Sequence, residues 1–171
     1  MVRFIVGFST PIRPTLFAKA IMVADNIPYD HVYVKWNWKE VDRNIIYQAS
    51  KFAVNFETEQ SFKNHCIALE EYELELTDET FTSILQFCVD NSNKSYGFKQ
   101  ILGFAWVKLN RIFGRKIQNP AGITGNEWIC SAIGAAILVI AGVDLKEPIK
   151  DVDPHDLNMI IKTIPAIRRV L

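Results

Sequence analysis

The chain has 171 residues, of which 49% are hydrophobic, and this suffices for one hydrophobic core but is short for two. Lysine and arginine total 19, as do aspartate and glutamate, so a formal net charge of zero provides no overall field to attract nucleic acid or an anionic membrane. We therefore expect a single domain over residues 1–171 and no nucleic-acid partner.

The first half of the chain is predicted to be rich in strands. Arg3–Phe8 is a short β-type run, and Thr15–Ala24 has helical spacing. His31–Trp38 alternates like a half-buried strand, and Asn44–Ala49 follows it after a polar turn, so we expect these two to pair as a hairpin. Cys66–Leu76 ends in alternating residues and predicts a further strand.

The second half is predicted to be helical. The expected helices are, in chain order, Glu79–Val89, Gly97–Phe113, the apolar stretch after Glu127 that ends at Gly142, and a last helix from Asp153-Pro154 to about Ile164. A loop is expected at Asn119–Gly122. Together the elements predict an α+β fold, with an antiparallel β-sheet packed against helices.

The cysteines and the start of the chain bear on the compartment. Cys66, Cys88 and Cys130 are few and odd in number, which suits a reducing compartment, and no CxxC spacing suggests zinc. The opening residues lack the features of a secretory signal, and the longest apolar run, about 12 residues, is shorter than the roughly 20 that span a bilayer. We expect a cytoplasmic protein with no transmembrane segment, no metal and no cofactor.

Cys130 is the candidate nucleophile. Thr124 to Glu127 has the spacing of a capping box, which would place Cys130 one to two turns inside a helix, where the helix dipole favours a thiolate only weakly. An imidazole would therefore have to supply most of the activation. His31 opens one strand of the expected hairpin and Gln48 lies near the end of the other, so Gln48 could orient the His31 ring. From the residues alone, a small buried cysteine and a structural histidine are the commoner explanation, and a catalytic pair is the alternative.

The order of several short motifs resembles the circularly permuted papain-like cysteine hydrolases, the YiiX-like branch of the NlpC-type superfamily. That family has a histidine strand, then a strand with a polar residue, then a late helix that starts with cysteine and serine. The matching segments here are Asp30-His31-Val32-Tyr33-Val34, Ile46-Tyr47-Gln48-Ala49, Asn93-Lys94-Ser95-Tyr96-Gly97, Trp128-Ile129-Cys130-Ser131, Ala141-Gly142-Val143-Asp144-Leu145 and Asp153-Pro154-His155-Asp156-Leu157.

The resemblance implies a papain-like fold and acyl transfer by a triad. Cys130 would be the nucleophile, His31 the general base and later general acid, and Gln48 the orienting residue, in a position where many relatives carry an acid. We therefore expect a thiol amidase or peptidase, active near neutral pH through a thiolate, on a peptide, a peptidoglycan fragment or an acyl amide.

Two other functions stay open. The basic residues of the expected helix Gly97–Lys116 could lie on an anionic membrane surface, as in a lipid-directed acyltransferase or thioesterase, and the aromatic strand Tyr33–Trp38 could bind a ligand without catalysis. A core-packed helix and an ordinary strand explain both features as well.

Overall fold

The computed structural model describes residues 1–50, 53–97, 99, 101, 103, 106, 107, 110, 114, 115, 117, 127–146 and 148–171. The strands are β1 (Val2–Pro11), β2 (His31–Trp38), β3 (Arg43–Ala49), β4 (Val54–Thr58), β5 (Cys66–Leu76), β6 (Ser95–Tyr96), β7 (Glu127–Trp128) and β8 (Arg168–Arg169). The helices are α1 (Leu16–Asp25), α2 (Glu59–Lys63), α3 (Asp78–Asn91), α5 (Cys130–Ile140) and α6 (Pro154–Lys162), with short 3-10 turns at Lys39–Val41 and Ile149–Asp151.

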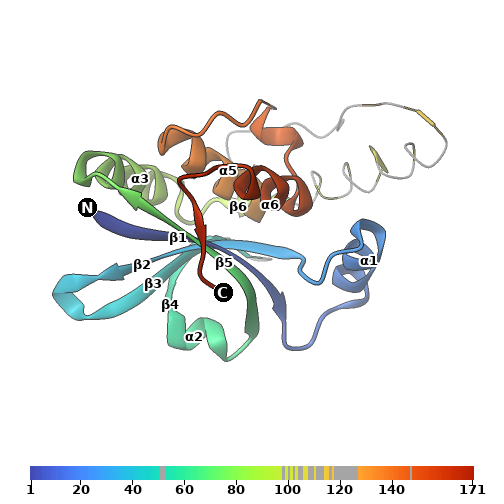
Figure 1. The fold of residues 1–171 in the computed structure, drawn as a ribbon. Coiled ribbons are helices and arrows are strands. Elements are labelled where there is room, and N and C mark those ends of the chain that lie inside the picture. Colours follow the sequence, from blue (N-terminus) through green and yellow to red (C-terminus); the bar gives the residue numbers. More distant parts are fainter. Residues whose placement is uncertain are drawn as a thin grey trace.

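Six of the strands form one antiparallel sheet in the order β4-β3-β2-β1-β5-β8. Helices α3, α5 and α6 lie over one face of this sheet, and α2 lies on the other side (Figure 1). The predicted α+β fold with an antiparallel sheet and packed helices is confirmed. Strands β6 and β7 form a separate parallel pair just before α5.

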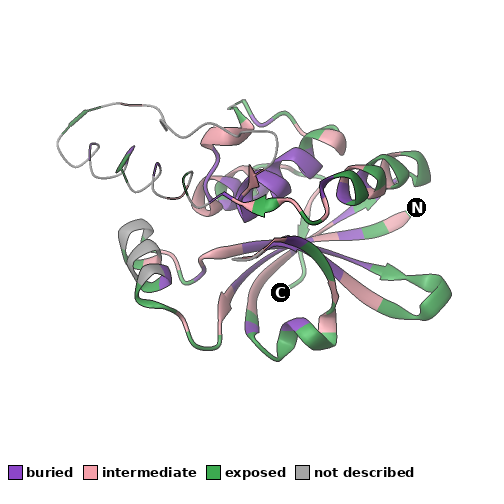
Figure 2. Ribbon diagram, turned by 180° about the vertical axis from the view of Figure 1, so that it is seen from behind, coloured by how far each residue is buried: buried purple, intermediate pink, exposed green. Residues whose placement is uncertain are grey.

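The main core lies between the sheet and the helices. Alternate residues of β1 and β2, among them Phe4, Phe8 and Val34, face the buried side of α5. Helix α5 is buried from Cys130 to Leu138, which explains why its sequence is apolar all round rather than on one stripe (Figure 2). The start of α5 is therefore held between the sheet and the neighbouring helices.

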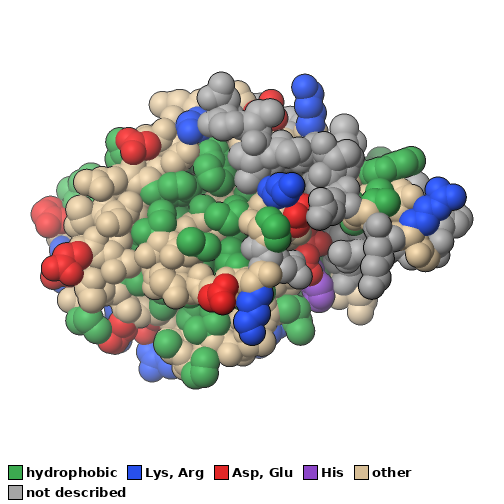
Figure 3. All heavy atoms as spheres, turned by 90° about the horizontal axis from the view of Figure 1, so that it is seen from above, with side chains coloured by type: hydrophobic (Ala, Val, Ile, Leu, Met, Phe, Trp, Pro, Cys, Tyr) green, Lys and Arg blue, Asp and Glu red, His purple; other side chains and the backbone are tan. Residues whose placement is uncertain are grey.

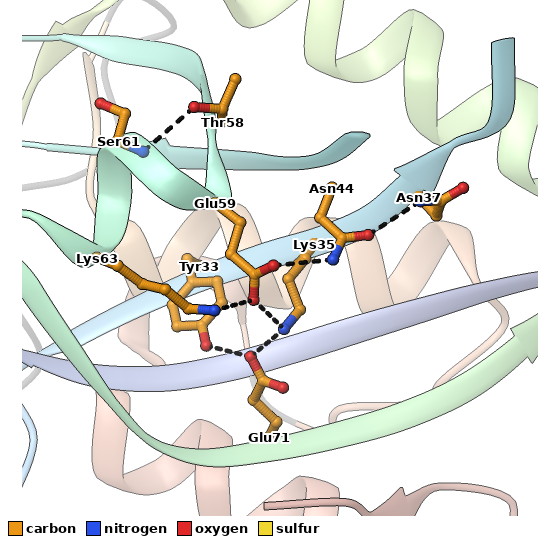
Figure 4. Close-up of polar contacts among 9 residues, drawn as sticks. All are labelled: Tyr33, Lys35, Asn37, Asn44, Thr58, Glu59, Ser61, Lys63 and Glu71. Atoms are coloured by element: carbon orange, nitrogen blue, oxygen red, sulfur yellow. Dashed lines mark hydrogen bonds and ion pairs between the residues drawn. The ribbon is translucent and has the colours of Figure 1, made fainter. Parts of the chain in front are cut away.

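The opposite face of the sheet is polar around a small apolar cluster of Tyr33, Ile46, Phe62 and Cys66. Lys35 is buried there, with its ammonium 2.5 Å from Glu71 and 3.2 Å from Glu59 (Figure 4). The Tyr33 hydroxyl donates to Glu71 at 2.6 Å, and the Asn44 amide donates to Glu59 at 2.8 Å. Because each buried charge has a partner, this face can carry ionised groups without leaving them unpaired.

Several predicted elements are confirmed by the structure and others need correction. The bounds of β2 and β5 and the pairing of β2 with β3 are as predicted. The prediction that the Cys130 helix starts at a capping box is wrong, because α5 begins at Cys130 itself and the preceding Glu127 and Trp128 form β7. Thr124, the loop at residues 119–122 and most of the expected helix over residues 97–116, with its basic face, lie outside the described residues.

Candidate active site

The first residue of α5 is Cys130, and Ile129 precedes it as N-cap without a side-chain hydrogen bond. Strand β7 pairs with β6 immediately before this point, so Tyr96 lies opposite Trp128 and next to the helix start. A side chain in the first helical turn experiences the strongest effect of the helix dipole, which favours an anion. The structure thus gives the thiol a more favourable position for ionisation than the sequence prediction did.

The Cys130 sulfur is surrounded by donors but shielded from water. The backbone N–H groups of Val32 and Ser131 and the hydroxyl of Tyr96 all favour the thiolate. Burial acts in the opposite direction and is stronger, since the residue is only 4% exposed, and it raises the pKa of the thiol to about 11. The expectation of a thiolate near neutral pH is therefore not met by the resting structure, in which the thiol is protonated.

His31 and Gln48 are in direct contact across the two strands. His31 Nε2 lies 2.5 Å from Gln48 Oε1, and the ladder between β2 and β3 runs from Val34 opposite Tyr47 to Trp38 opposite Arg43. Beyond this ladder, the side chain of His31, the first residue of β2, meets that of Gln48, the second-last residue of β3. The structure therefore brings together the predicted base and the predicted orienting residue.

The contact fixes the tautomer of His31. An amide oxygen can only accept a hydrogen bond, so Nε2 must carry the proton and Nδ1 keeps its lone pair. Burial lowers the pKa of His31 below its ordinary value of 6.5, against the opposing effects of Gln48, Asp30 and Glu57. A neutral ring with a free Nδ1 lone pair is the form that can accept a proton.

The thiol and the ring approach β2 from different sides. Strand alternation puts the His31 side chain on the face of the sheet that carries Tyr33, whereas α5 packs on the Val32 side, where a Cβ added at Gly134 would lie 3.0 Å from Val32 Cγ1. No hydrogen bond joins the Cys130 thiol to the His31 ring, both of which are described residues. The predicted direct hydrogen bond between Cys130 and His31 is therefore not formed in this structure. The sulfur does reach the backbone N–H of Val32, the residue next to His31, and a contact with the ring through one water stays a prediction.

Three further residues belong to this site, although none of them was assigned a role from the sequence. Asp30 interacts electrostatically with both His31 and Cys130, and burial raises the pKa of its carboxyl group. Tyr96 contacts the thiol, and burial raises the pKa of its hydroxyl well above the ordinary value. Glu57 accepts a hydrogen bond from Gln48 Nε2. Asp30 and Tyr96 lie in the segments that carry the family resemblance, so these two could have been found from the sequence. Glu57 could not, because its strand, β4, was not predicted.

The carboxyl-terminal part of β1, next to His31, is irregular. The pairing of β1 with β5 shifts register between Phe8 and Ser9, and these two residues lie opposite Val32 and His31 on the other side of β1. Such bulges turn the end of a strand and re-aim nearby side chains, and they are common beside active sites. The bulge therefore gives a local reason for an altered course of the backbone next to His31.

The outer surface offers a separate feature at the far end of α5. A hollow of about 500 Å³ is lined by residues around the carboxyl end of that helix, including Val139, Leu145 and Pro148. Hydrophobic side chains also gather on the helix-covered side of the molecule (Figure 3). The hollow lies at the opposite end of α5 from Cys130, so it is not part of the candidate site.

Comparisons with known proteins give no match: no family model, no curated protein and no solved structure is similar to this chain. Within the described residues, no helix is both long enough and apolar enough to span a bilayer. The same residues contain no group of three or more histidine, cysteine or acidic side chains arranged to hold a metal ion.

Proposed function

We propose that the chain is a thiol hydrolase that cleaves an amide or a related acyl bond. Cys130 is the nucleophile, His31 the general base and then general acid, and Gln48 the residue that orients the ring. The observation that carries this proposal is the His31–Gln48 hydrogen bond, made one residue away from the Val32 N–H group that faces the Cys130 sulfur. The chain order of histidine strand, glutamine strand and late cysteine helix further supports a circularly permuted papain-like fold.

The resting pair is neutral, and this shapes the reaction. As the sulfur attacks the carbonyl carbon, its proton passes to His31 Nδ1, and the ring then protonates the leaving amine or alcohol as the C–N or C–O bond breaks. Water next attacks the thioester, with His31 taking the proton from the water and returning it to Cys130 as the acid product leaves. Gln48 holds the ring throughout by accepting from Nε2–H.

Backbone groups at the start of α5 can stabilise the tetrahedral intermediate. Ile129 provides no side-chain cap for the first N–H groups of this helix, although the Ser131 N–H already donates to the Cys130 sulfur. The N–H of Cys130 itself is the nearest of them to the attacked carbonyl carbon and is the proposed oxyanion donor.

The proposed substrate class is an amide next to a small amino acid or peptide. The test is turnover of a panel of aminoacyl and dipeptidyl p-nitroanilides, with a set of acyl esters in parallel. We expect hydrolysis of at least one amide, lost in Cys130→Ala and retained in Cys88→Ala. Hydrolysis of esters alone, at equal rates in both variants, would contradict the assignment.

A non-catalytic binding protein on the same scaffold is the second candidate. The 4% exposure of Cys130 favours it, because a substrate must reach the sulfur. This candidate predicts that neither amides nor esters are turned over, and that Cys130→Ala changes only stability.

A further inference from the structure

Glu57 stands directly behind the proposed triad. It lies on β4 opposite Ile46 of β3, two positions from the pair Gln48–Asn55, and its side chain is 13% exposed. Gln48 Nε2 donates a hydrogen bond to Glu57 Oε1. The chain of contacts therefore runs from His31 through the Gln48 amide to the Glu57 carboxylate.

The carboxylate determines which way the Gln48 amide points. An isolated glutamine can present either its oxygen or its NH₂ group to a histidine ring, and the two orientations impose opposite tautomers. A carboxylate accepts only, so it holds the NH₂ group of Gln48 and turns Oε1 toward His31. The lone pair on Nδ1, which the proposed reaction needs, therefore depends on Glu57.

The carboxylate also supplies the negative charge that Gln48 lacks. An amide stabilises an imidazolium ion less than an acid does, and burial opposes that ion further. Glu57 favours protonation of His31 electrostatically, although it does not touch the ring. Gln48 is a neutral residue in contact with the His31 ring, and Glu57 is a charged residue behind it. Together they take the place of an acid in direct contact with the ring.

We propose that Glu57 is a positioning residue for His31, acting through Gln48 to fix the ring tautomer and to stabilise the imidazolium ion formed during acyl transfer. This proposal rests on the proposed function in that His31 is taken to be the base. The groups that face Glu57 are Gln48 on β3, His31 on β2, Cys66 at the start of β5 and His65, whose Nε2 is 3.5 Å from Glu57 Oε1.

The test is a histidine-ring NMR titration of the full chain. Only three histidines are present, so each ring can be assigned from single His→Gln variants. In Glu57→Gln, we expect the pKa of His31 to fall by about 0.5 to 1 unit, because a nearby negative charge is lost. The ring nitrogen shifts should also lose the pattern of a single Nε2–H tautomer, since glutamine can both donate and accept.

Two further variants isolate the cause. Glu73→Gln is the matched control, since Glu73 is 11% exposed and pairs with Arg168 away from the site, and it should leave His31 unchanged. In the Gln48→Ala background, Glu57→Gln should no longer change the tautomer of His31, while the direct electrostatic effect of the lost charge on the His31 pKa remains. If Glu57→Gln unfolds the chain, Glu57→Asp is used instead, and we expect it to loosen the tautomer while largely keeping the pKa.

An unchanged His31 pKa and tautomer in a folded Glu57 variant would overturn the proposal, as would an effect of Glu57→Gln on the tautomer that persists without Gln48. These readouts do not need a substrate. Failure of the proposed function would instead appear as an unreactive Cys130 in the wild-type chain, so the two failures can be told apart.

Discussion

At the scale of single residues, the thiol of Cys130 and the ring of His31 are both neutral at rest. Burial raises the pKa of the thiol to about 11 and lowers that of the ring below 6.5. A preformed thiolate–imidazolium pair would require the reverse order of the two pKa values. The proposed reaction must therefore move the proton while the sulfur attacks, as a hydroxyl nucleophile with a histidine base does.

This neutral pair predicts a broad pH profile. His31 can act as the base only while it is deprotonated, so the acidic limb of the acylation rate should lie below pH 6.5. On the alkaline side, the rate should change only near pH 11, where Cys130 ionises. We expect the rate of ester hydrolysis to vary less than about threefold between pH 7 and 10. A narrow maximum at pH 6 to 7 would instead show that the ion pair forms at rest.

At the scale of the elements, the strands that carry His31 and Gln48 could be predicted because their residues alternate between two faces that differ in polarity. Strand β4 and helix α2 could not, since β4 is short, is exposed at most of its positions without alternation, and resembles a polar loop. The start of α5 was placed too early because a capping-box spacing is a local signal, whereas the β6–β7 pairing is a contact between distant segments.

The same limits apply to the candidate site. His31, Gln48 and Cys130 were found from motif order, and the His31–Gln48 contact followed from the hairpin. The raised pKa of Cys130 depends on how many atoms surround the sulfur, which no local pattern in the sequence encodes. Glu57 was missed because its role depends on the register between β3 and β4.

The close packing of α5 against β2 at Gly134 predicts the effect of a substitution there. A Cβ added at Gly134 would lie 2.8 Å from Leu157 Cδ2 and 3.0 Å from Val32 Cγ1, so in Gly134→Ala either these side chains must shift or α5 must move away from β2. We expect a loss of about 1 to 3 kcal/mol in the free energy of unfolding, as overpacking usually costs.

Activity should fall with it, because Cys130 and Val32 move apart. Val139→Ala, on the exposed side of the same helix, serves as control and should change stability by less than about 0.5 kcal/mol. Denaturant unfolding and ester turnover of both variants provide the measurement, and full activity in Gly134→Ala would argue against a role for the α5–β2 contact in the site.

At the scale of the whole molecule, burial of thiols should limit stability at high pH. Burial raises the pKa of Cys88 to about 12 and of Cys130 to about 11, from an ordinary value of 9.0. Above pH 9 the unfolded chain releases protons that the folded chain retains, so each group destabilises the fold by about 1.4 kcal/mol per pH unit until its folded pKa is reached.

Thermal unfolding should therefore shift to lower temperature between pH 9 and 11. Cys88→Ala removes one of these groups and should make the decline shallower, even though the small cavity it leaves lowers the melting temperature at pH 7. A melting temperature that is flat from pH 8 to 11 would show that the thiols are accessible to water in the native state.

The central claim is that Cys130 attacks an acyl group with the help of His31. Brief reaction of the full chain with p-nitrophenyl acetate at pH 7.5, acid quenching and peptide mass mapping tests it most directly. The account predicts a single acetyl group, carried by Cys130, at least about tenfold less of it in His31→Ala, and an intermediate amount in Gln48→Ala. Acetylation of Cys66 or surface lysines instead, or equal labelling of Cys130 in the wild type and His31→Ala, would contradict it.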